Sequence, residues 1–531
     1  MTGPLQRDVD VVFDVAVIGL GPVGLTLVHL LAKEGLRVVG IERNEGAHPL
    51  PRAIGLDHEA MRIFQRIGIA DPLLPFTGAY CDTEYRAADN TVLRRIVQAP
   101  GPPPLAWPPN LTFIQPELER LLLEHAQRLP RVSLWFGTEA VHITARDQSV
   151  ELAVASGASE RSNLRATYVV GCDGANSWLR QQRGLSLDDL NFDQSWLVVD
   201  LLLSEGVDLP RVNVQLCDPA RPTTYVCTPG TTRRWEFMML PGETAEDMTR
   251  PKRIWELLQP WITLDQARIW RTAAYRFHAL VASRWRDGNC FLAGDACHQT
   301  PPFLAQGLNQ GLRDAANLAW KLGAVLRKEA GGALLDTYED ERRRNVREVI
   351  EITKALGSTI GERDPARAHE RNIAMLADVA AGKGVTIRQD LLPPLKHGLI
   401  DAATTSKGAG APVPQPWIRL GGEDRRLDDI MRHGWRILYS DACEATDAVK
   451  RAAMKVNASM AQIRKSDGRG VTERWYIERD GVIDRWLAQH AAVAVVVRPD
   501  GIAYGTAATD SHLVALLDSL AQRLTERAPS R

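Results

Sequence analysis

The sequence predicts an α/β protein with a parallel-sheet domain, an antiparallel sheet inserted into that domain, and a smaller C-terminal α/β domain. Three observations lead to this prediction. A strand, a glycine loop, a helix and a strand follow each other near the N-terminus, short β-rich segments fill the middle, and another strand-and-helix block ends the chain. The length of 531 residues also favours two or three domains over one.

Charge and cysteine content narrow the class of function. The 64 basic and 65 acidic residues almost cancel, which favours a small-molecule function over binding to nucleic acid or to an anionic membrane. The seven cysteines are scattered, without a Cys-x-x-Cys pair or a histidine cluster at metal-ligand spacing, so no metal site is predicted. Asp14 and three glycines interrupt the apolar stretch near the N-terminus, so we expect a cytoplasmic protein with no membrane segment.

The first unit has the pattern of a Rossmann-like βαβ fold. A nearly continuous apolar strand at 13–18 is followed by Gly-x-Gly-x-x-Gly, a helical pattern and a second strand at 37–41 that ends in Glu42. An acidic residue about 20 positions after the glycines is suited to hold ribose hydroxyls. The alternative, a glycine-rich turn without a ligand, is disfavoured because strand, helix and acid are all present.

Each glycine of the motif has its own expected role. Gly19 permits the tight turn, Gly21 lets a pyrophosphate approach the backbone, and Gly24 allows the helix to pack closely on the strand. Pro22 and Val23 begin the helix, whose free N–H groups and positive dipole favour phosphates. The five residues together predict a dinucleotide site.

Further elements follow from periodicity and from turn residues. Gln115 to Ala126 has the pattern of a helix, and strands are expected at 132–136, 150–154 and 167–170. The stretch "GCDGANSWLR" at 171–180 begins another helix. Helices and strands therefore alternate through the first part of the chain.

Between about residues 191 and 277, short β-rich segments bounded by Gly, Pro or Asp predict an inserted antiparallel sheet. In one of them Trp235 and Phe237 would share one face, and Arg234 and Glu236 the other. The aromatic face either packs into a core or covers a pocket for an aromatic ligand.

The segment 291–322 brings a Gly-Asp pair, a double proline and the run Gly-Leu-Asn-Gln-Gly to the start of one helix. A linker rich in Pro, Gly and Ala, at about 391–416, precedes the last block. That block has predicted strands at 434–440 and 492–501 and a helix near 512–523. It is the expected third domain.

Three of these stretches, in this order, resemble the fingerprints of the class A FAD-dependent aromatic hydroxylases: "VIGLGPVG", "CDGANSWLR" and "GDACHQTPPFLAQGLNQGLRDAANLAWKL". Within that family, "PLPRAIGLDHEAMRIFQRIG", "FIQPELERLL" and "RPDGIAYG" are most similar to the 3-(3-hydroxyphenyl)propionate and 3-hydroxycinnamate hydroxylases. Ala305 departs from the family pattern, which usually has glycine there.

The resemblance implies a fold like that of p-hydroxybenzoate hydroxylase with an added domain. Residues 1–190 and 281–400 would form the FAD-binding domain, and 191–280 the substrate-binding sheet domain. Residues 412–531 would form a thioredoxin-like domain, which lacks the redox Cys-x-x-Cys and is therefore expected to be structural.

The resemblance also implies the reaction. FAD would be reduced by NADH or NADPH, bound only transiently because the sequence has one dinucleotide motif, and a flavin C4a-hydroperoxide would then hydroxylate a phenolic ring ortho to its hydroxyl. The substrate would be an aryl-propionate or cinnamate-type acid or a related small aromatic compound, and the protein a monomer or homodimer.

Residue by residue, the resemblance assigns the adenosine end of FAD to Glu42 and Arg43 and the pyrophosphate to Arg52. Asp295 would bind the ribityl chain, and Asp173 would lie behind the cofactor. The remaining cofactor-binding candidates are Gln115, Val141, Gly294, Gly307, Leu308 and Asn309.

Phenol activation needs a hydrogen-bond acceptor or base near the ring. His58, Tyr225 and the backbone carbonyl before or at Pro302 are the candidates, and spacing does not choose among them. Arg234 could pair with a substrate carboxylate or serve an interdomain contact, and Trp235 and Phe237 are the aromatic candidates of the wall.

Two other functions share the FAD motif. One is an FAD-dependent epoxidase or reductase of a nonaromatic substrate, which usually adds apolar membrane-binding segments not found here. The other is a noncatalytic flavin-binding protein, against which the presence of Asp173, Asp295 and the double proline argues. A flavin disulfide reductase is a poor alternative, because it needs a redox-active cysteine pair soon after the glycine motif and no cysteine occurs before Cys81.

Overall fold

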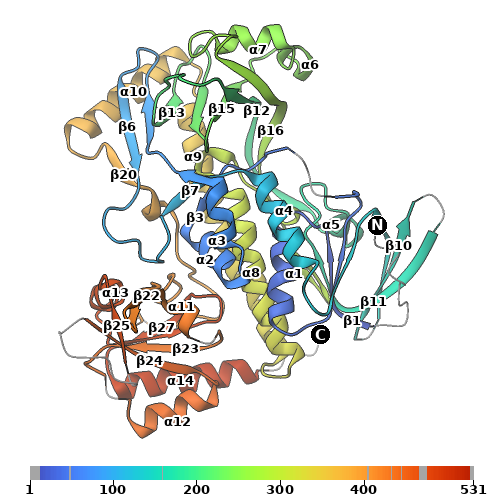
Figure 1. Cartoon of the computed structure of the whole chain (residues 1–531), viewed down its shortest axis with the longest axis vertical. Coiled ribbons are helices and arrows are strands. Elements are labelled where there is room, and N and C mark those ends of the chain that lie inside the picture. Colours follow the sequence, from blue (N-terminus) through green and yellow to red (C-terminus); the bar gives the residue numbers. More distant parts are fainter. Residues whose placement is uncertain are drawn as a thin grey trace.

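The structure is a computed structural model of the chain, and it describes residues 12–46, 50–146, 148–157, 160–403, 406–431, 433–443, 445–465 and 475–526. Figure 1 shows three regions: a mainly antiparallel sheet at the top, a mixed α/β region in the centre and at the right, and a separate α/β domain at the lower left. The α/β fold class predicted from the sequence is confirmed.

The first sheet is the predicted nucleotide-binding sheet. Its parallel core has the order β18-β11-β1-β2-β8, and β10 and β9 extend it as an antiparallel hairpin. The side chains of Val15, Ala16 and Val17 in β1 are fully buried, as expected for a central strand. The strands are β1 (Val12–Ile18), β2 (Val38–Ile41), β8 (Val132–Trp135), β9 (Thr138–Ala145), β10 (Val150–Ser156), β11 (Glu160–Gly171), β17 (Arg286–Asp287) and β18 (Cys290–Leu292).

The second sheet is larger than the predicted insertion. Its order is β19-β16-β12-β15-β14-β13-β5-β6-β20, so β5, β6, β19 and β20 join it from outside residues 191–280. β5 and β6 are consecutive strands that pair with each other, but they lie far in the sequence from the insertion and from β20, and tertiary pairing brings them together. The strands are β5 (Thr83–Arg86), β6 (Val92–Val97), β12 (Leu187–Leu203), β13 (Asn213–Leu216), β14 (Thr223–Cys227), β15 (Thr232–Met238), β16 (Ala267–Ala282), β19 (His298–Gln299) and β20 (Val385–Ile387).

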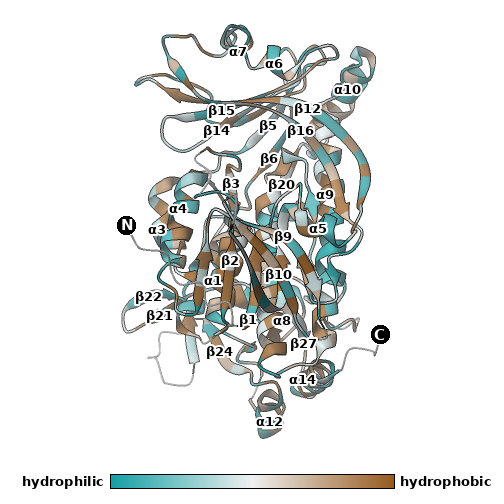
Figure 2. Ribbon diagram, turned by 90° about the vertical axis from the view of Figure 1, so that its right-hand side faces the viewer, coloured by the Kyte–Doolittle hydropathy of each residue, from teal (hydrophilic) through white to brown (hydrophobic). Residues whose placement is uncertain are grey.

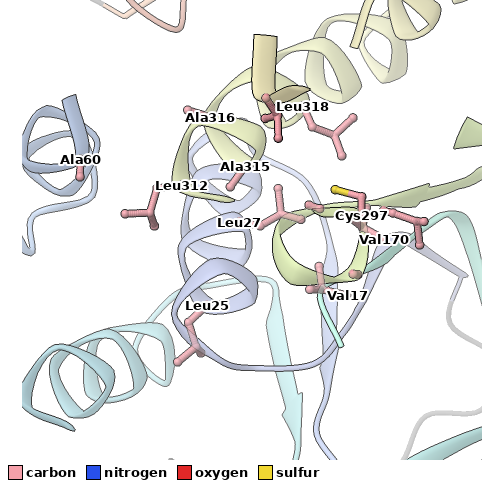
Figure 3. Packing of buried hydrophobic residues seen from close by; sticks show 14 of the residues in the cluster. Val17, Leu25, Leu27, Ala60, Val170, Cys297, Leu312, Ala315, Ala316 and Leu318 are labelled. Atoms are coloured by element: carbon pink, nitrogen blue, oxygen red, sulfur yellow. The ribbon is translucent and has the colours of Figure 1, made fainter. Parts of the chain in front are cut away.

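Helices connect and cover these sheets. The long helices α8 and α9 cross the centre of the molecule (Figure 1), and α8 packs on α1, with the small side chain of Ala315 between the two helices (Figure 3). Figure 2 shows the hydrophobic segments gathered in α1, α8 and the central strands. The helices of these regions are α1 (Pro22–Lys33), α2 (His58–Ile67), α3 (Ala70–Leu73), α4 (Gln115–Ala126), α5 (Trp178–Gln182), α6 (Ala245–Met248), α7 (Pro251–Leu258), α8 (Gly307–Leu326), α9 (Asp336–Ile360) and α10 (Pro365–Ala380).

Two further elements complete the central region. The small sheet β3-β7-β4 lies beside α2 and α8, and it consists of β3 (Gly55–Asp57), β4 (Thr77–Ala79) and β7 (Asn110–Phe113). Two short 3-10 turns, η2 (Gly294–Ala296) and η3 (Pro302–Leu304), lead into α8. The Gly-Asp pair and the double proline of the sequence therefore lie in turns, as their conformational preferences require.

The C-terminal domain has its own sheet, in which β23, β24 and β25 are parallel and β26 and β27 are antiparallel additions. The predicted strands at 434–440 and 492–501 and the predicted last helix are confirmed as β23, β26 and α14. The elements are β21 (Trp417–Leu420), β22 (Glu423–Arg426), β23 (Arg436–Tyr439), β24 (Ser459–Lys465), β25 (Trp475–Glu478), β26 (Ala494–Val497), β27 (Ala503–Ala507), α11 (Leu427–Ile430), α12 (Asp447–Lys455), α13 (Val482–Gln489) and α14 (Asp510–Thr525).

A buried ion network joins this domain to the long helices. Glu341 of α9 accepts a hydrogen bond from Arg498 (2.7 Å) and lies 2.9 Å from the amine of Lys321 in α8, and all three side chains are fully buried. Arg498 also binds Asp500 at 2.6 Å. In the part of the chain that the structure describes, no helix is long and apolar enough to cross a membrane.

Candidate active site

The glycine loop between β1 and α1 has the geometry of a phosphate site. A Cβ atom at Gly24 would lie 1.9 Å from the carbonyl oxygen of Gly19, so the helix packs there as closely as the backbone allows. A Cβ at Gly21 would meet no atom within 4 Å, and no side chain caps this helix end. The loop therefore leaves open space and unpaired N–H groups where a pyrophosphate would lie.

Glu42 at the end of β2 is held in a fixed orientation. Its Oε2 accepts a hydrogen bond from Leu20 N (2.9 Å), and its Oε1 accepts from the backbone N (3.0 Å) and the side-chain amide (2.6 Å) of Asn44. Arg43 is exposed beside it, and Val141 is exposed on β9. The contacts of Glu42, Arg43 and Val141 with the adenosine end of FAD stay predictions.

Gln115 holds the Arg52 segment in place, and its predicted contact with FAD stays a prediction. Its Oε1 accepts hydrogen bonds from the backbone N–H groups of Arg52 (3.0 Å) and Ala53 (2.6 Å), and its Nε2 donates to Glu119 (2.6 Å). The side chain is buried, and both ends of its amide are used within the protein. Gln115 thus positions the Arg52 segment, while the exposed side chain of Arg52 is available to the cofactor.

The carboxylate of Asp173 also forms hydrogen bonds within its own segment of the chain. One carboxylate oxygen accepts from the hydroxyl of Ser177 (2.5 Å) and the other from the backbone N–H of Leu179 (3.0 Å). The side chain caps the short helix α5 and stays partly accessible. Its predicted place behind the cofactor is compatible with this position and stays a prediction.

The turn that carries Asp295 is fixed from behind by a buried network. Asp314 of α8 accepts from Gly294 N (3.1 Å), lies 2.9 Å from His298 Nε2, and accepts from Arg342 Nε (2.9 Å). The carboxylate of Asp295 points to solvent, and the surrounding protein raises its pKa. Asp295 is therefore an accessible acceptor on a rigid turn, as a ribityl-binding residue requires.

The start of α8 offers a second open helix end. A Cβ at Gly307 would meet no atom within 4 Å, and no side chain caps this helix. Asn309 is buried and binds the β3 segment through Asp57 N (3.1 Å) and Gly55 O (3.1 Å), so it positions this loop, and the neighbouring Leu308 is half-buried. The N–H groups at 307 and 308 are free to meet the reactive end of FAD.

Ala305 adopts the left-handed backbone conformation that favours glycine. Its φ is 51°, which costs a non-glycine residue roughly 1 kcal/mol. Gly55 lies opposite, where a Cβ would approach the Ala305 methyl to 2.9 Å. The methyl group of Ala305 is thus accommodated by a glycine across the loop.

The two faces of the inserted sheet have different surroundings. Tyr225, Trp235 and Phe237 pack with Ile254 and Leu258 of α7 in one hydrophobic cluster. The hydroxyl of Tyr225 donates to the carbonyl of Pro210 (3.0 Å). This face is turned away from the FAD-binding domain, so the predicted substrate roles of Tyr225, Trp235 and Phe237 are wrong, and these residues form a core.

The opposite, inner face carries a buried polar cluster. Arg234 donates two hydrogen bonds to the carboxylate of Asp200 (2.6 and 3.0 Å) and a third to the carbonyl of Arg52 (2.8 Å) in the FAD-binding domain. Arg271 of β16 also binds Asp200 (3.2 Å) and donates to the hydroxyl of Tyr275. Arg234 thus makes the interdomain contact that was one of its two expected roles, and its pairing with a substrate carboxylate stays a prediction.

Glu236 lies on the same inner face between the two arginines. The residue is 6 % exposed. Burial raises the pKa of its carboxyl, although the positive charges of Arg234 and Arg271 act in the opposite direction. Tyr275 lies on β16, two strands away from Glu236 in the same sheet, and is only half-buried. The carboxyl group of Glu236 and the phenol of Tyr275 are the groups of this face that can exchange a proton.

Aromatic rings continue this face toward η3. Phe303 of η3 contacts Trp196 and Phe277, with ring centroids 5.6 and 6.3 Å apart, and Phe277 stacks on Tyr275 at 6.4 Å. The neighbouring Pro302 is half-buried, and its carbonyl accepts from Ala305 N (2.8 Å). The double proline therefore meets the inner face of the sheet, between the sheet and the start of α8.

His58 lies at the first position of α2. It lines a cavity between α2 and the C-terminal domain, and also a smaller one that borders Leu304 and Gln306. Burial lowers its pKa, and its Nδ1 has no hydrogen-bond partner among the described residues. Its contact with a substrate stays a prediction.

Sequence reasoning missed the inner-face residues Trp196, Asp200, Arg271, Tyr275 and Phe277 as candidates. One signal pointed to them: Arg234 and Glu236 alternate with the apolar residues Trp235, Phe237 and Met238 in this strand. Charged residues that are buried in this way need partners, and the neighbouring strands had to supply them.

Replacing Asp295 by alanine is expected to weaken FAD binding at least about tenfold without unfolding the protein, since one charged hydrogen bond contributes about 1.5 kcal/mol or more. The measurement is the dissociation constant of FAD, from flavin fluorescence, next to a thermal unfolding curve. Asp89→Ala, at an exposed turn, is the control. Equal FAD affinity in the Asp295 variant and the parent would contradict the assignment.

Comparisons with known proteins agree with this geometry. A family model described as "FAD binding domain" matches residues 12–353, and one described as "HcaD C-terminal domain" matches residues 410–523. A probable NADH-specific resorcinol 4-hydroxylase of Rhodococcus jostii is 35% identical over 98% of this chain and 96% of its own length. A 3-(3-hydroxy-phenyl)propionate/3-hydroxycinnamic acid hydroxylase of Mycolicibacterium smegmatis is 35% identical over 80% of this chain and 76% of its own length.

Solved structures show the same fold. Aklavinone-11 hydroxylase in a ternary complex with FAD and aklavinone superimposes with a TM-score of 0.78 at 24% identity, over 98% of this chain and all of that one. The flavin-dependent monooxygenase PieE, in complex with FAD and substrate, gives a TM-score of 0.79 at 21% identity, over 97% of this chain and all of that one.

Proposed function

The chain belongs to the FAD-dependent aromatic hydroxylases, the class A flavin monooxygenases, and on this basis we propose that its substrate is a small phenol without a carboxylate, of which resorcinol is the test case. The inner face of the inserted sheet carries this proposal. It combines aromatic rings with the hydroxyl of Tyr275 and the buried carboxyl of Glu236, while Arg234 is already paired with Asp200.

The reaction transfers one oxygen atom of O2 to the ring and releases the other as water. NADH or NADPH gives up a hydride and becomes NAD⁺ or NADP⁺, a proton is taken from solvent, and a C–H bond of the ring becomes C–OH. Bound FAD supplies the redox chemistry, because side chains alone cannot activate O2. Gly21, Glu42, Arg52, Asp295 and the start of α8 are the proposed holders of FAD.

The protein itself would provide a binding surface that excludes water and orients the ring of the substrate. Trp196, Phe277 and Phe303 present aromatic surfaces, which suit a flat ring and exclude water. The Pro301-Pro302 turn would place this ring against the reactive end of FAD. Excluding water here protects the activated oxygen from being lost as peroxide.

The polar part of the same face would handle the phenolic proton. The hydroxyl of Tyr275 receives a hydrogen bond from Arg271, which fixes its position on this face. The substrate hydroxyl would bind Tyr275 or Glu236 and lose its proton as the ring is attacked. Arg271, which contacts both Tyr275 and Asp200, would orient the hydrogen bonds around the phenolate that forms.

Tyr275→Phe and Glu236→Gln are each expected to lower kcat by about 100-fold or more, because loss of a general base or its relay typically has that effect. FAD binding should stay as in the parent. Tyr225→Phe is the matched control, since Tyr225 lies in the core on the outer face, and it should keep the parent kcat. Full activity in both inner-face variants would contradict their assigned roles.

The proposed substrate class is tested by NAD(P)H oxidation together with product analysis. Resorcinol should stimulate oxidation of NADH or NADPH and yield a trihydroxybenzene, with little hydrogen peroxide. The comparison compounds are 3-(3-hydroxyphenyl)propionate, which adds a carboxylate, and 3-phenylpropionate, which has no hydroxyl. A higher kcat/KM for 3-(3-hydroxyphenyl)propionate than for resorcinol would overturn the choice of a neutral phenol.

A further inference from the structure

Two of the seven cysteines lie next to each other on the outer face of the inserted sheet, away from the proposed flavin and substrate sites. Cys81 comes shortly before β5, and Cys227 is the last residue of β14. Cys227 belongs to the hydrophobic cluster of Tyr225 and Trp235, and Cys81 packs against that cluster. The thiols of Cys81 and Cys227 are hydrogen-bonded to each other, and neither is part of a disulfide.

The strand order explains why these two cysteines meet although they lie far apart in the sequence. Strand β13 lies between β5 and β14, and it is parallel to β5 and antiparallel to β14. The start of β5 and the end of β14 are therefore at the same end of the sheet. Because β13 begins only at Asn213, the two thiols come together beyond the end of this middle strand.

The side chain of Asn213 holds both cysteine backbones. Its Nδ2 donates a hydrogen bond to the carbonyl of Cys81 (2.8 Å), and its Oδ1 accepts one from the backbone N–H of Cys227 (2.9 Å). Asn213 is buried, and both ends of its amide are used in this way. Two thiols that face each other from fixed backbones meet the first geometric condition for a disulfide, which is that the side chains point toward one another.

The two thiols differ in accessibility and in acidity. Cys81 is half-buried, whereas Cys227 is buried, with its Sγ 3.3 Å from the carbonyl oxygen of Pro210. The hydrogen bond from Cys227 and the positive charge of Arg233 lower the pKa of Cys81 to about 7, although burial and Asp82 act in the opposite direction. The thiolate is the nucleophilic form of cysteine, so Cys81 is the member of the pair that reacts first.

Arg233 places a positive charge beside this pair. It is the cross-strand partner of Cys227 in the ladder of β14 and β15, so both side chains are on the outer face. Its Nη1 donates to three backbone carbonyls of the turn between these strands, at 2.6 to 3.1 Å. These acceptors are neutral, so the guanidinium keeps its charge and can stabilise a thiolate.

The other five cysteines have the opposite chemical character. Burial raises the pKa of each of their thiols, which keeps them protonated and unreactive at neutral pH. These cysteines are Cys172, Cys217, Cys290, Cys297 and Cys443. An oxidant in solution would therefore react first at Cys81.

We propose that Cys81 and Cys227 are a site of reversible oxidation by hydrogen peroxide, at which the two thiols become a disulfide. In the first step the thiolate of Cys81 attacks one oxygen atom of the peroxide and the O–O bond breaks. A sulfenic acid forms, and the hydroxide that leaves takes up the thiol proton of Cys81 to become water. In the second step the sulfur of Cys227 attacks the sulfenic sulfur, the S–O bond breaks, and the hydroxyl leaves with the thiol proton of Cys227 as a second water.

The reaction balances with one peroxide for each disulfide. The two cysteines together lose two electrons and two protons, and the peroxide is reduced to two molecules of water. A flavin monooxygenase forms hydrogen peroxide whenever its activated oxygen is not transferred to the substrate, so the oxidant is a side product of this family's own chemistry. The disulfide would join the chain segment that enters the inserted sheet at β5 to the end of β14. This site goes beyond the proposed hydroxylation and does not depend on its substrate.

The test is thiol mapping by mass spectrometry of the FAD-loaded full chain after treatment with hydrogen peroxide. Free thiols are blocked with N-ethylmaleimide while the protein is unfolded, so that disulfides cannot exchange before digestion. Cys81→Ser and Cys227→Ser each remove one partner of the pair. Cys217→Ser is the matched control, because it removes another buried thiol of the same sheet, just after β13.

We expect a pair of linked peptides that contain Cys81 and Cys227 and that separate on reduction. The linked pair should be absent from Cys81→Ser and from Cys227→Ser, and as abundant in Cys217→Ser as in the parent. In Cys227→Ser the oxidised Cys81 should persist as a sulfenic acid, which dimedone traps. In the parent at neutral pH, Cys81 should lose its free thiol at least about tenfold faster than Cys217, because a larger fraction of it is thiolate.

Three results in the parent protein would overturn the proposal. They are peroxide that leaves both thiols free, oxidation of Cys81 without a bond to Cys227, and oxidation of Cys81 no faster than that of Cys217. Because these three measurements need no variant, they decide the question even if a serine variant fails to fold.

Discussion

Gly24→Ala is expected to destabilise the FAD-binding domain by about 3 kcal/mol or more, because overpacking at a rigid contact has a cost of this size. The added methyl would lie 1.9 Å from the carbonyl oxygen of Gly19, which is backbone and cannot rotate away. Helix α1 would have to move from β1, and Val17 and Leu27 lose their packing (Figure 3). The measurement is the free energy of unfolding from urea denaturation.

Gly21→Val separates the role of the glycine loop in binding FAD from its role in the stability of the domain. Its side chain would enter open space, so stability should stay within about 0.5 kcal/mol of the parent, as for ordinary surface changes. FAD affinity should fall by roughly 10- to 100-fold, the value of one or two charged hydrogen bonds. Gly46→Ala, where a methyl also meets nothing, is the control for both measurements. Unfolding by Gly21→Val, or tight FAD binding in that variant, would contradict the separation.

The features that the sequence predicted well depend on neighbours in the chain. The βαβ unit, the helix at Gln115–Ala126 and the strands of the C-terminal block are set by local periodicity and by nearby glycines and prolines. The turn and packing roles of Gly19 and Gly24 also follow from a spacing of a few residues. For this reason they needed no knowledge of distant contacts.

The face of β15 could not be chosen in the same way. Alternation separates Arg234 and Glu236 from Trp235 and Phe237, but it does not say which pair meets the FAD-binding domain. The answer comes from contacts far away in the sequence, namely Arg52 on one side and helix α7 on the other. An aromatic pair suggests a ligand pocket as readily as a core, and here it is a core.

Roles of side chains that bridge distant segments were also beyond sequence reasoning. Gln115 holds the Arg52 segment, and His58 lies at an interface whose other half begins more than 350 residues later. The same holds for β5, β6 and β20, which complete the inserted sheet from outside the predicted insertion. Contacts between distant segments determine each of these features, and such contacts leave no local pattern in the sequence.

Glu341→Gln is expected to lower the free energy of unfolding by about 3 to 5 kcal/mol, because it removes one partner of a buried ion network. The carboxylate of Glu341 faces the cations of Lys321 and Arg498, which hold its pKa well below the usual range. Burial lowers the pKa of Lys321 to about 8 even with this carboxylate present. Without it, a buried cation would remain uncompensated.

The double variant Glu341→Gln with Lys321→Met tests this cause directly. Removing the cation as well should recover part of the lost stability, since an apolar replacement of a buried pair is often neutral. Glu348→Gln, on the same helix, is the control: its partner Lys396 is exposed, so the cost should be below about 1 kcal/mol. Urea unfolding followed by tryptophan and flavin fluorescence measures all three. A Glu341→Gln protein as stable as the Glu348→Gln protein would show that the C-terminal domain is held by its apolar contacts and not by these charges.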